Sequence, residues 1–155
     1  MDLTFKVGEK EKFNVRTAAI IRCNDYYLIS KREDKDYYSL PGGRINFKED
    51  SKSGILRELK EELDFDINPN SIKLVRIIEN FFSFKDDSYF HEYLFVYLID
   101  VSNKYLKKGN FINLENPIMH MEWYNKSDFL KLNIKPSILK DVLNDDSFKH
   151  LIIKE

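Results

Sequence analysis

The chain has 155 residues, 43% of them hydrophobic and 33% charged, and its net charge is −1. This length and composition predict one ordinary globular domain that spans residues 1–155. No apolar run approaches the length of a membrane span, and the first residues lack the apolar core of a signal peptide. We therefore expect a cytoplasmic protein with no membrane partner.

Charge and cysteine content argue against two further classes of protein. The chain has no basic tract, so nothing in it indicates binding to long nucleic acid, although a mononucleotide could still be a substrate. The single cysteine, Cys23, excludes an internal disulfide and a Cys-rich zinc site. Because Cys23 lies in an apolar segment, we expect it to be a buried strand residue.

The N-terminal part of the chain predicts strands joined by turns. Residues 1–12 are charged but contain enough apolar side chains for a short first strand. The β-branched and apolar content of residues 13–22 and 26–31 predicts a hairpin. The segment 32–39 is polar and is expected to be a loop.

The next segment predicts an amphipathic helix that runs to Leu63. It begins near Asp50 or Ser51, either of which can act as the N-cap. At about 100° per residue, four aliphatic side chains share one arc of this helix and should face the core. These side chains are Ile55, Leu56, Leu59 and Leu63.

The second half of the chain predicts another antiparallel pair of strands followed by helices. The predicted elements are, in order, a strand over 72–84 with a polar break at Glu79-Asn80, a strand over 89–101, an irregular segment over 103–117, a strand over 118–124, a short helix from Ser127, and a helix capped by Ser137. Strands on either side of one central helix, with helices after them, predict a mixed α/β sandwich whose helices cover both faces of the sheet.

A second arc of the central helix is acidic and consists of Glu58, Glu61 and Glu62. At the helical spacings of three and four, neither Glu58 nor Glu62 has a cationic neighbour, and each pair of like charges costs about 0.2–0.5 kcal/mol. Arg57 could pair with Glu61 one turn further on. A divalent cation would relieve the repulsion, because hard ions such as Mg²⁺ are held by carboxylates and substrate phosphate oxygens. The ordinary alternative is a solvated acidic helix face.

The turn in front of the helix favours the metal-site interpretation. Pro41, Gly42 and Gly43 form a rigid and then permissive turn. In such a turn the main chain can approach a ligand closely and offer bare carbonyls or amides. The turn leads directly into the start of the acidic helix.

The spacing of these residues resembles the Nudix box, GX5EX7REUXEEXGU, in which U is a bulky aliphatic residue. The matching residues are Gly43, Glu49, Arg57, Glu58, Leu59, Glu61 and Glu62, and the LPGG lead-in is also typical of the family. Two positions depart, since Asp64 replaces a glycine and Phe65 replaces an aliphatic residue. Because that glycine follows the helix end, we expect Asp64 to adopt a left-handed C-cap conformation at some cost.

The resemblance implies a fold, an activity and a cofactor. The implied fold is the Nudix-type α/β/α sandwich, with a mixed β-sheet and a central acidic helix. The implied activity is metal-dependent hydrolysis of a nucleoside diphosphate linked to another moiety, by attack of water on a phosphorus of the pyrophosphate. Mg²⁺, or alternatively Mn²⁺, would be the metal, and a small nucleotide would be the substrate.

The resemblance also implies roles for individual residues. The implied metal ligands are Glu58, Glu61, Glu62 and the carbonyl of Gly42, with Arg57 in the same catalytic group and Gly43 and Glu49 beside the substrate. The spacing alone does not place Glu49 among the metal ligands. On a helical wheel it lies about 120° from Ile55 and off the acidic arc.

The sequence leaves the general base open, because Nudix proteins draw it from different places. Glu92 on a predicted strand and Glu115 in the irregular segment are the candidates, with Glu79 less favoured. For each of them the alternative is an ordinary surface carboxylate. His91 could contact substrate or be an ordinary strand histidine, and the aromatic residues of 81–90 could stack a base or pack in the core.

Two other functions are compatible with the sequence. A Nudix-fold binding or regulatory protein would sense a nucleotide without hydrolysing it, but such members often have a degraded box, whereas every acidic position is intact here. An acidic protein-interaction domain without a nucleotide ligand would make the Pro-Gly-Gly turn a coincidence. The substrate, the number of metal ions and the oligomeric state stay open, with a homodimer possible.

Overall fold

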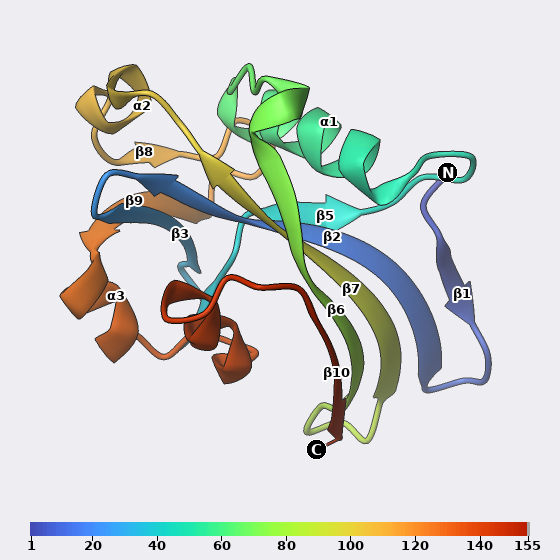
Figure 1. Ribbon diagram of the computed structural model, residues 1–155. Coiled ribbons are helices and arrows are strands. Elements are labelled where there is room, and N and C mark those ends of the chain that lie inside the picture. Colours follow the sequence, from blue (N-terminus) through green and yellow to red (C-terminus); the bar gives the residue numbers. More distant parts are fainter. Residues whose placement is uncertain (155) are drawn as a thin grey trace.

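The computed structural model describes residues 1–154, which form a mixed β-sheet with helices on both of its faces (Figure 1). The strands are β1 (Thr4–Lys6), β2 (Glu11–Cys23), β3 (Tyr26–Arg32), β4 (Tyr38–Ser39), β5 (Gly42–Arg44), β6 (Ile72–Ser83), β7 (Tyr89–Asp100), β8 (Phe111–Ile112), β9 (Met119–Asn125) and β10 (Lys149–Lys154). The helical segments are α1 (Ser51–Leu63), α2 (Asn103–Lys107), α3 (Lys126–Lys131) and the 3-10 turns η1 (Pro69–Ser71) and η2 (Ser137–Leu143).

The strands pair in the order β10-β6-β7-β2-β3-β9-β8, with β1 and β5 also paired to β2, and β4 to β3. The β2–β7 and β10–β6 pairs are parallel, and the others are antiparallel. The mixed sheet and the two helical layers confirm the predicted α/β/α sandwich.

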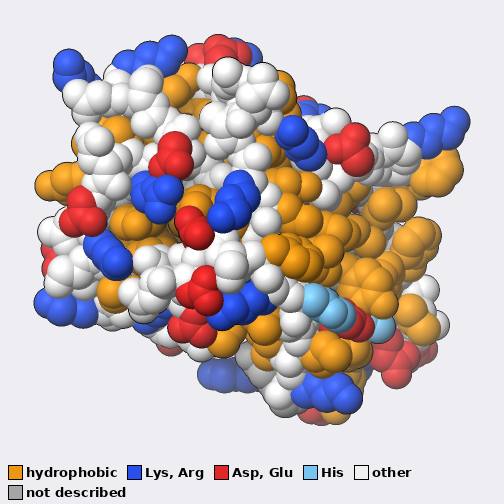
Figure 2. Space-filling model, in the orientation of Figure 1, with side chains coloured by type: hydrophobic (Ala, Val, Ile, Leu, Met, Phe, Trp, Pro, Cys, Tyr) orange, Lys and Arg blue, Asp and Glu red, His pale blue; other side chains and the backbone are white. Residues whose placement is uncertain are grey.

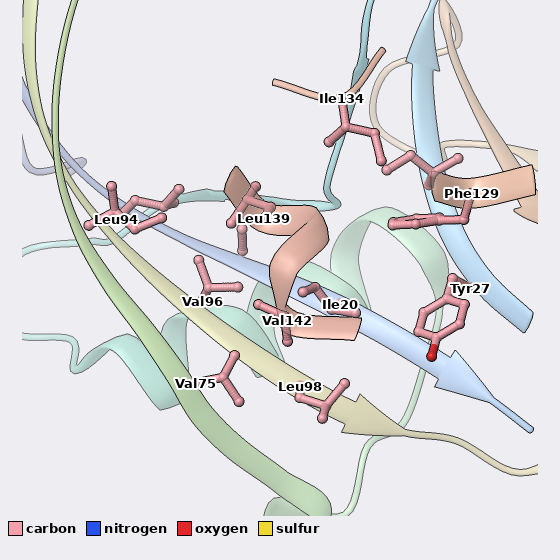
Figure 3. Close-up of a cluster of buried hydrophobic side chains, with 13 residues drawn as sticks. Ile20, Tyr27, Val75, Leu94, Val96, Leu98, Phe129, Ile134, Leu139 and Val142 are labelled. Carbon is pink, nitrogen blue, oxygen red and sulfur yellow. The ribbon is translucent and has the colours of Figure 1, made fainter. Parts of the chain in front are cut away.

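The two faces of the sheet bury two separate hydrophobic clusters, because successive strand residues point to opposite faces. On β2, Ala18 and Ile20 face the cluster covered by η2 and α3, whereas Ala19 and Ile21 face α1. Figure 3 shows the first cluster, in which strand residues meet Phe129 of α3 and the inner side of η2. Cys23 is buried in β2, as predicted.

Helix α1 begins and ends as the sequence predicts. Asp50 is the N-cap, and its Oδ1 accepts a hydrogen bond of 2.8 Å from the N–H of Ser53. Ile55, Leu59 and Leu63 are fully buried, whereas Leu56, which we expected to face the core, is only partly buried and lies outside both hydrophobic clusters. The helix ends at Asp64, whose backbone is left-handed with φ 56° and ψ 36°.

The C-terminal third differs from the sequence-based expectations at several points. Strand β6 runs through Glu79-Asn80 without a break, and its irregularity lies instead between Leu74 and Arg76. Ser137 does not cap a helix, because Pro136 is the N-cap residue of η2 and makes no side-chain cap hydrogen bond. The segment expected to be irregular contains α2 and β8.

Strand β10 is absent from the sequence-based prediction, and Arg76 explains where it lies. The side chain of Arg76 is fully buried. Its guanidinium donates to the carbonyls of Val75, Ser147 and Asp145 at 2.6–2.7 Å. These bonds attach the turn before β10 to β6, which β10 then joins in parallel.

Hydrophobic side chains gather at the end of the sheet where β1, β2, β7, β6 and β10 lie, on the right of Figure 2. Phe5, Tyr89 and Ile152 are more than half exposed there. The register puts Tyr93 and Phe95 on one face of β7, and Phe95 packs in the α1-side cluster. Helix α1 therefore covers the part of this face that contains Phe95, whereas Tyr93 is exposed. Within residues 1–154, no helix is long and apolar enough to cross a membrane.

The C-cap of α1 generates a stability prediction. Asp64→Gly should raise the free energy of unfolding by less than about 1 kcal/mol, because glycine adopts the left-handed conformation without strain. The gain is partly offset, since the Asp64 carboxylate pairs with Lys60 at 2.7 Å in an exposed i,i+4 pair. Urea unfolding measures the difference.

Asp64→Ala is the matched control for this substitution. It loses the same ion pair but keeps a Cβ in the left-handed conformation, so it should be less stable than both the wild type and Asp64→Gly. If the glycine variant were the least stable of the three, the left-handed backbone would not be the source of strain.

Candidate active site

The glycine turn lies directly under the acidic face of α1. Strand β5 pairs with β2, which sets Gly43 opposite Thr17 and Gly42 opposite Ala18. A Cβ at Gly43 would overlap the carboxylate of Glu58, and one at Gly42, where φ is 154°, would overlap the carbonyl of Thr17. Both glycines are therefore needed for close packing between the turn, β2 and α1.

Arg57 connects this turn to the acidic side chains. Its Nε and Nη2 donate to the two carboxylate oxygens of Glu49 at 2.7 and 2.9 Å, and Nη2 also donates to the carbonyl of Arg44. Its Nη1 donates to Glu58 at 3.1 Å and to Glu61 at 3.2 Å. The predicted pair with Glu61 is confirmed.

The contact between Arg57 and Glu58 corrects one sequence-based inference. Glu58 has no cation at the spacings of three or four, but the adjacent Arg57 reaches its carboxylate through Nη1 while its Nε and Nη2 pair with Glu49. Of the two carboxylates expected to lack a cationic partner, only Glu62 forms no ion pair within residues 1–154. The acidic face is thus partly compensated at its start and uncompensated at its end.

Glu49 is occupied by Arg57 rather than directed at the acidic group. Besides the two bonds from Arg57, its Oε1 accepts a hydrogen bond of 3.0 Å from the N–H of Asn46. The Arg57 guanidinium, together with that N–H, holds the pKa of Glu49 below its usual value. Glu49 is therefore an ionised anchor for Arg57.

Carboxylate oxygens of Glu58, Glu61 and Glu115 lie within 4.8 Å of one another. Glu115 comes from the loop between β8 and β9. In that loop Asn113 Oδ1 accepts from the backbone N–H groups of Glu115 and Asn116 at 2.9 and 3.0 Å. The adjacent Leu114 N–H donates to the carbonyl of Glu62. The loop is thus fixed against the end of α1, with Glu115 held at the acidic group.

In the acidic group, burial and close packing of the carboxylates raise pKa values. Burial, with the neighbouring charge of Glu58, raises the pKa of Glu62 from 4.5 to about 8. Burial also raises the pKa of Glu58, against the opposing effect of Arg57. Two close carboxylates in a partly buried site share a proton when no cation is bound.

A cleft of about 490 Å³ opens beside this group, with Glu62 and Asn113 in its wall. Gly42 and Pro41 also line it. The cationic residues of the lining are Arg16, Arg32, Lys35 and Lys135, and the aromatic ones are Tyr37, Phe82 and Phe84. A cleft with several cations beside a carboxylate group can hold a ligand that carries phosphates.

Glu92 lies in the cleft wall and outside the carboxylate group of Glu58, Glu61 and Glu115. It is 6% exposed, and Arg16 Nε is 3.7 Å from its Oε1. Burial raises the pKa of Glu92, while Arg16 and Asn80 oppose the rise. Glu92 and Glu115, the two candidates for general base, are thus in different parts of the site.

Glu79 and His91 are on the face of the sheet opposite the cleft, and the aromatic residues of 81–90 are divided between the two faces. Glu79 is paired with His150 at 2.7 Å, and its strand partner is Tyr93 rather than a cleft residue. His91 stacks on Phe81 at 4.3 Å between ring centres. Of the aromatic residues of 81–90, only Phe82 and Phe84 line this cleft.

Sequence reasoning missed Asn80, Asn113 and Arg16. Asparagine side chains often accept hydrogen bonds from the backbone N–H groups two or three residues later, so Asn113 was a local signal for the loop. The only sequence signal from Asn80 was that it interrupts an apolar strand. The position of Arg16 depends on the pairing of β2 with β7, which no local signal gives.

Comparison with known proteins places the chain in one family. The sequence model of the NUDIX domain matches residues 13–144. The MutT protein from Bacillus halodurans is similar in structure, with a TM-score of 0.69 at 19% identity, over 91% of this chain and 90% of that chain. A NUDIX hydrolase from Nitrosomonas europaea has a TM-score of 0.62 at 17% identity, over 92% of this chain and 79% of that chain. No curated protein matches the chain in sequence.

The crowding at Glu62 generates a prediction for stability in EDTA. A carboxyl whose pKa is 4.5 unfolded and about 8 folded binds more protons in the folded state between these values. Folding stability therefore falls as pH rises from about 4.5 to 8. Glu62→Gln removes this dependence, so in EDTA it should melt higher than the wild type at pH 8 and the two should converge near pH 4.5.

Addition of Mg²⁺ at pH 8 should reverse the order, because a ligand that binds only the folded state stabilises the protein that binds it better. A solvated glutamate would instead give equal melting temperatures at every pH. Identical Mg²⁺-induced shifts in the two proteins would contradict a role of Glu62 in cation binding.

Proposed function

The chain belongs to the Nudix family, and we propose that it is a pyrophosphohydrolase that splits a nucleoside diphosphate linked to another moiety, using Mg²⁺ or Mn²⁺. The observation that carries this proposal is the group of carboxylate oxygens from Glu58, Glu61 and Glu115, within 4.8 Å of one another. The cleft beside it carries the cations that a phosphate-bearing substrate requires.

The donor set suits a hard divalent cation. Oxygen ligands are those that Mg²⁺ and Mn²⁺ prefer, and like charges this close are stable together only when a cation or a proton lies between them. Glu62 and the carbonyl of Gly42 would complete the ligands. A bound divalent cation supplies neutralisation of the pyrophosphate charge and a lower pKa for the attacking water.

Positioning of the carboxylates falls to Arg57 and Glu49. Arg57 donates to Glu58 and Glu61 while Glu49 fixes its other side, so that both carboxylates are held in one orientation. Glu49 thereby acts through Arg57 and not by touching the substrate. Gly43 keeps the space that the Glu58 carboxylate fills.

Glu115 is our candidate for the group that accepts the proton of the attacking water. It reaches the acidic group from a loop, and Asn113 fixes the backbone of that loop at 2.9 Å. Glu92 is outside the carboxylate group and pairs with Arg16, so we assign it to substrate binding. The sequence left the choice of base between Glu92 and Glu115 open, and the proposal assigns this role to Glu115.

The substrate end of the cleft would bind the nucleotide. Arg16, Arg32, Lys35 and Lys135 would contact phosphate oxygens, and no long nucleic acid or membrane is part of the proposal. A single domain over residues 1–155, a cytoplasmic location and a possible homodimer belong to the same proposal.

A hydrolysis screen tests the proposed function. Wild-type protein should hydrolyse at least one of a panel of nucleotide pyrophosphates with Mg²⁺ or Mn²⁺ and none in EDTA, as judged by chromatography of the products. Glu61→Gln should lower the rate by about 10²–10³, since it removes charge stabilisation at the reacting phosphate.

Glu79→Gln is the matched control, because Glu79 faces away from the cleft and pairs with His150. Its rate should equal that of the wild type. Tight nucleotide binding without turnover across the whole panel would instead identify a non-hydrolytic nucleotide sensor.

A further inference from the structure

We propose that Asn113 is a positioning residue of the reaction, because its side-chain amide joins the loop that carries Glu115 to Glu62 on α1. The inference rests on the proposed function, in which Glu115 accepts the proton of the attacking water and Glu62 is a metal ligand. It concerns a residue outside the motif that resembles the Nudix box.

Asn113 is buried in a loop whose other side chains are not. Between β8 and β9, Asn113 is 5% exposed, whereas the apolar side chain of Leu114 is 62% exposed. Glu115 is exposed as well. Burial of an amide beside a solvated leucine brings no hydrophobic gain, and it costs free energy unless the amide is hydrogen-bonded. The hydrogen bonds of Asn113 therefore explain why it is buried.

The oxygen of this amide is used by its own loop. Asn113 Oδ1 accepts from the backbone N–H groups of Glu115 at 2.9 Å and Asn116 at 3.0 Å. An amide oxygen has two lone pairs, so these two bonds fill its acceptor capacity. Because a backbone N–H can only donate, the oxygen has to be the atom that faces the loop. The orientation of the amide is thereby fixed, and its NH₂ group can only donate elsewhere.

The donor end of the amide meets Glu62. Burial and Glu58 raise the pKa of the Glu62 carboxyl to about 8, and a side-chain hydrogen bond from Asn113 opposes this rise. The next residue of the loop binds the main chain of the same glutamate, since the Leu114 N–H donates to the Glu62 carbonyl at 2.8 Å. Two consecutive loop residues therefore hold Glu62, one at its carboxylate and one at its carbonyl.

The position of Glu115 follows from these bonds. Its side chain is exposed, so packing does not hold it, and its carboxylate lies within 4.8 Å of those of Glu58 and Glu61. Like charges this close repel one another. A general base has to lie within hydrogen-bond reach of the proton that it accepts, and a displacement of about 1 Å can cost a factor of about 10² in rate. Asn113 keeps Glu115 in place by tying its backbone to Glu62.

The first test is a double-mutant cycle with Asn113→Ala and Glu115→Gln. With a substrate from the hydrolysis screen, Asn113→Ala should lower kcat by about 10–10² and change KM less than about twofold, because Glu115 takes part only in the chemical step. The double variant should have the kcat of Glu115→Gln alone, since Asn113 acts through Glu115. Losses that multiply in the double variant, or an unchanged kcat in Asn113→Ala, would overturn the inference.

The second test needs neither metal nor activity. In EDTA, amide hydrogen exchange at the N–H groups of Glu115 and Asn116 should be at least about tenfold faster in Asn113→Ala than in the wild type. Asn113→Asp keeps the accepting oxygen and loses only the donor, so both N–H groups should stay protected. Unchanged exchange in Asn113→Ala would contradict the role of the amide in the loop.

The variant Asn113→Asp also tests the link to Glu62. It places a second carboxylate against that of Glu62, so repulsion should weaken the bond from Leu114 and speed exchange of its N–H about fivefold. Adding Glu62→Gln should restore the wild-type exchange rate at Leu114, because an amide at position 62 can donate to the new carboxylate. The same exchange rate at Leu114 in the wild type and Asn113→Asp would show that the amide does not reach Glu62, and would overturn the inference.

Leu114→Ala is the matched control, because only its main chain takes part in these contacts while its side chain is exposed. It should keep the wild-type kcat and the wild-type exchange rates at Glu115 and Asn116. If Asn113→Ala fails to fold, Asn113→Leu replaces it, since leucine has a similar size and makes neither hydrogen bond.

Failure of this inference is distinguishable from failure of the proposed function. Normal turnover in Asn113→Ala would overturn the positioning role and leave the hydrolase. If the wild-type protein hydrolyses nothing on the panel, the hydrolase proposal fails, and hydrogen exchange in EDTA alone decides whether Asn113 joins the loop to Glu62.

Discussion

The geometry of the candidate site depends on the guanidinium of Arg57. One side chain donates to Glu49 and to the Arg44 carbonyl on the turn side, and to Glu58 and Glu61 on the helix. The fork of an arginine suits this arrangement, because its donors are planar and fixed relative to one another. This contact therefore joins the loop after β5 to the acidic face of α1.

The sheet provides the second constraint, since each strand residue is committed to one face. Along β2, Thr17 and Ala19 face α1, whereas Arg16 and Ala18 face the cleft. The carboxylate group and the cleft meet where β5 pairs with β2, and there the packing is so close that Gly42 and its neighbour have no room for a side chain. A nucleotide whose phosphates lie at the acidic group can therefore extend its base along the other face of the same strands.

Local chemistry made much of this predictable from the sequence. The caps of α1 at Asp50 and Asp64, its buried stripe and the hairpins depend on residues within a turn or two of one another. Glu115 could be named only as one of several carboxylates, because its place beside α1 depends on a loop fixed by hydrogen bonds. Asn80 and Glu92 are opposite each other because of the register between β6 and β7, which requires β6 to continue through Asn80 without a break. These tertiary contacts have no signal in a short window of sequence.

The most direct measurement for the account is anomalous X-ray scattering from crystals soaked in Mn²⁺. The account predicts anomalous density at coordination distance from the carboxylates of Glu58 and Glu61, with Glu62 and Glu115 adjacent. The density should be lost in crystals of Glu61→Gln grown and soaked in the same way. Ordered carboxylates with no density among them at saturating Mn²⁺, or an ion bound only elsewhere on the protein, would contradict the claim that this group is a metal centre.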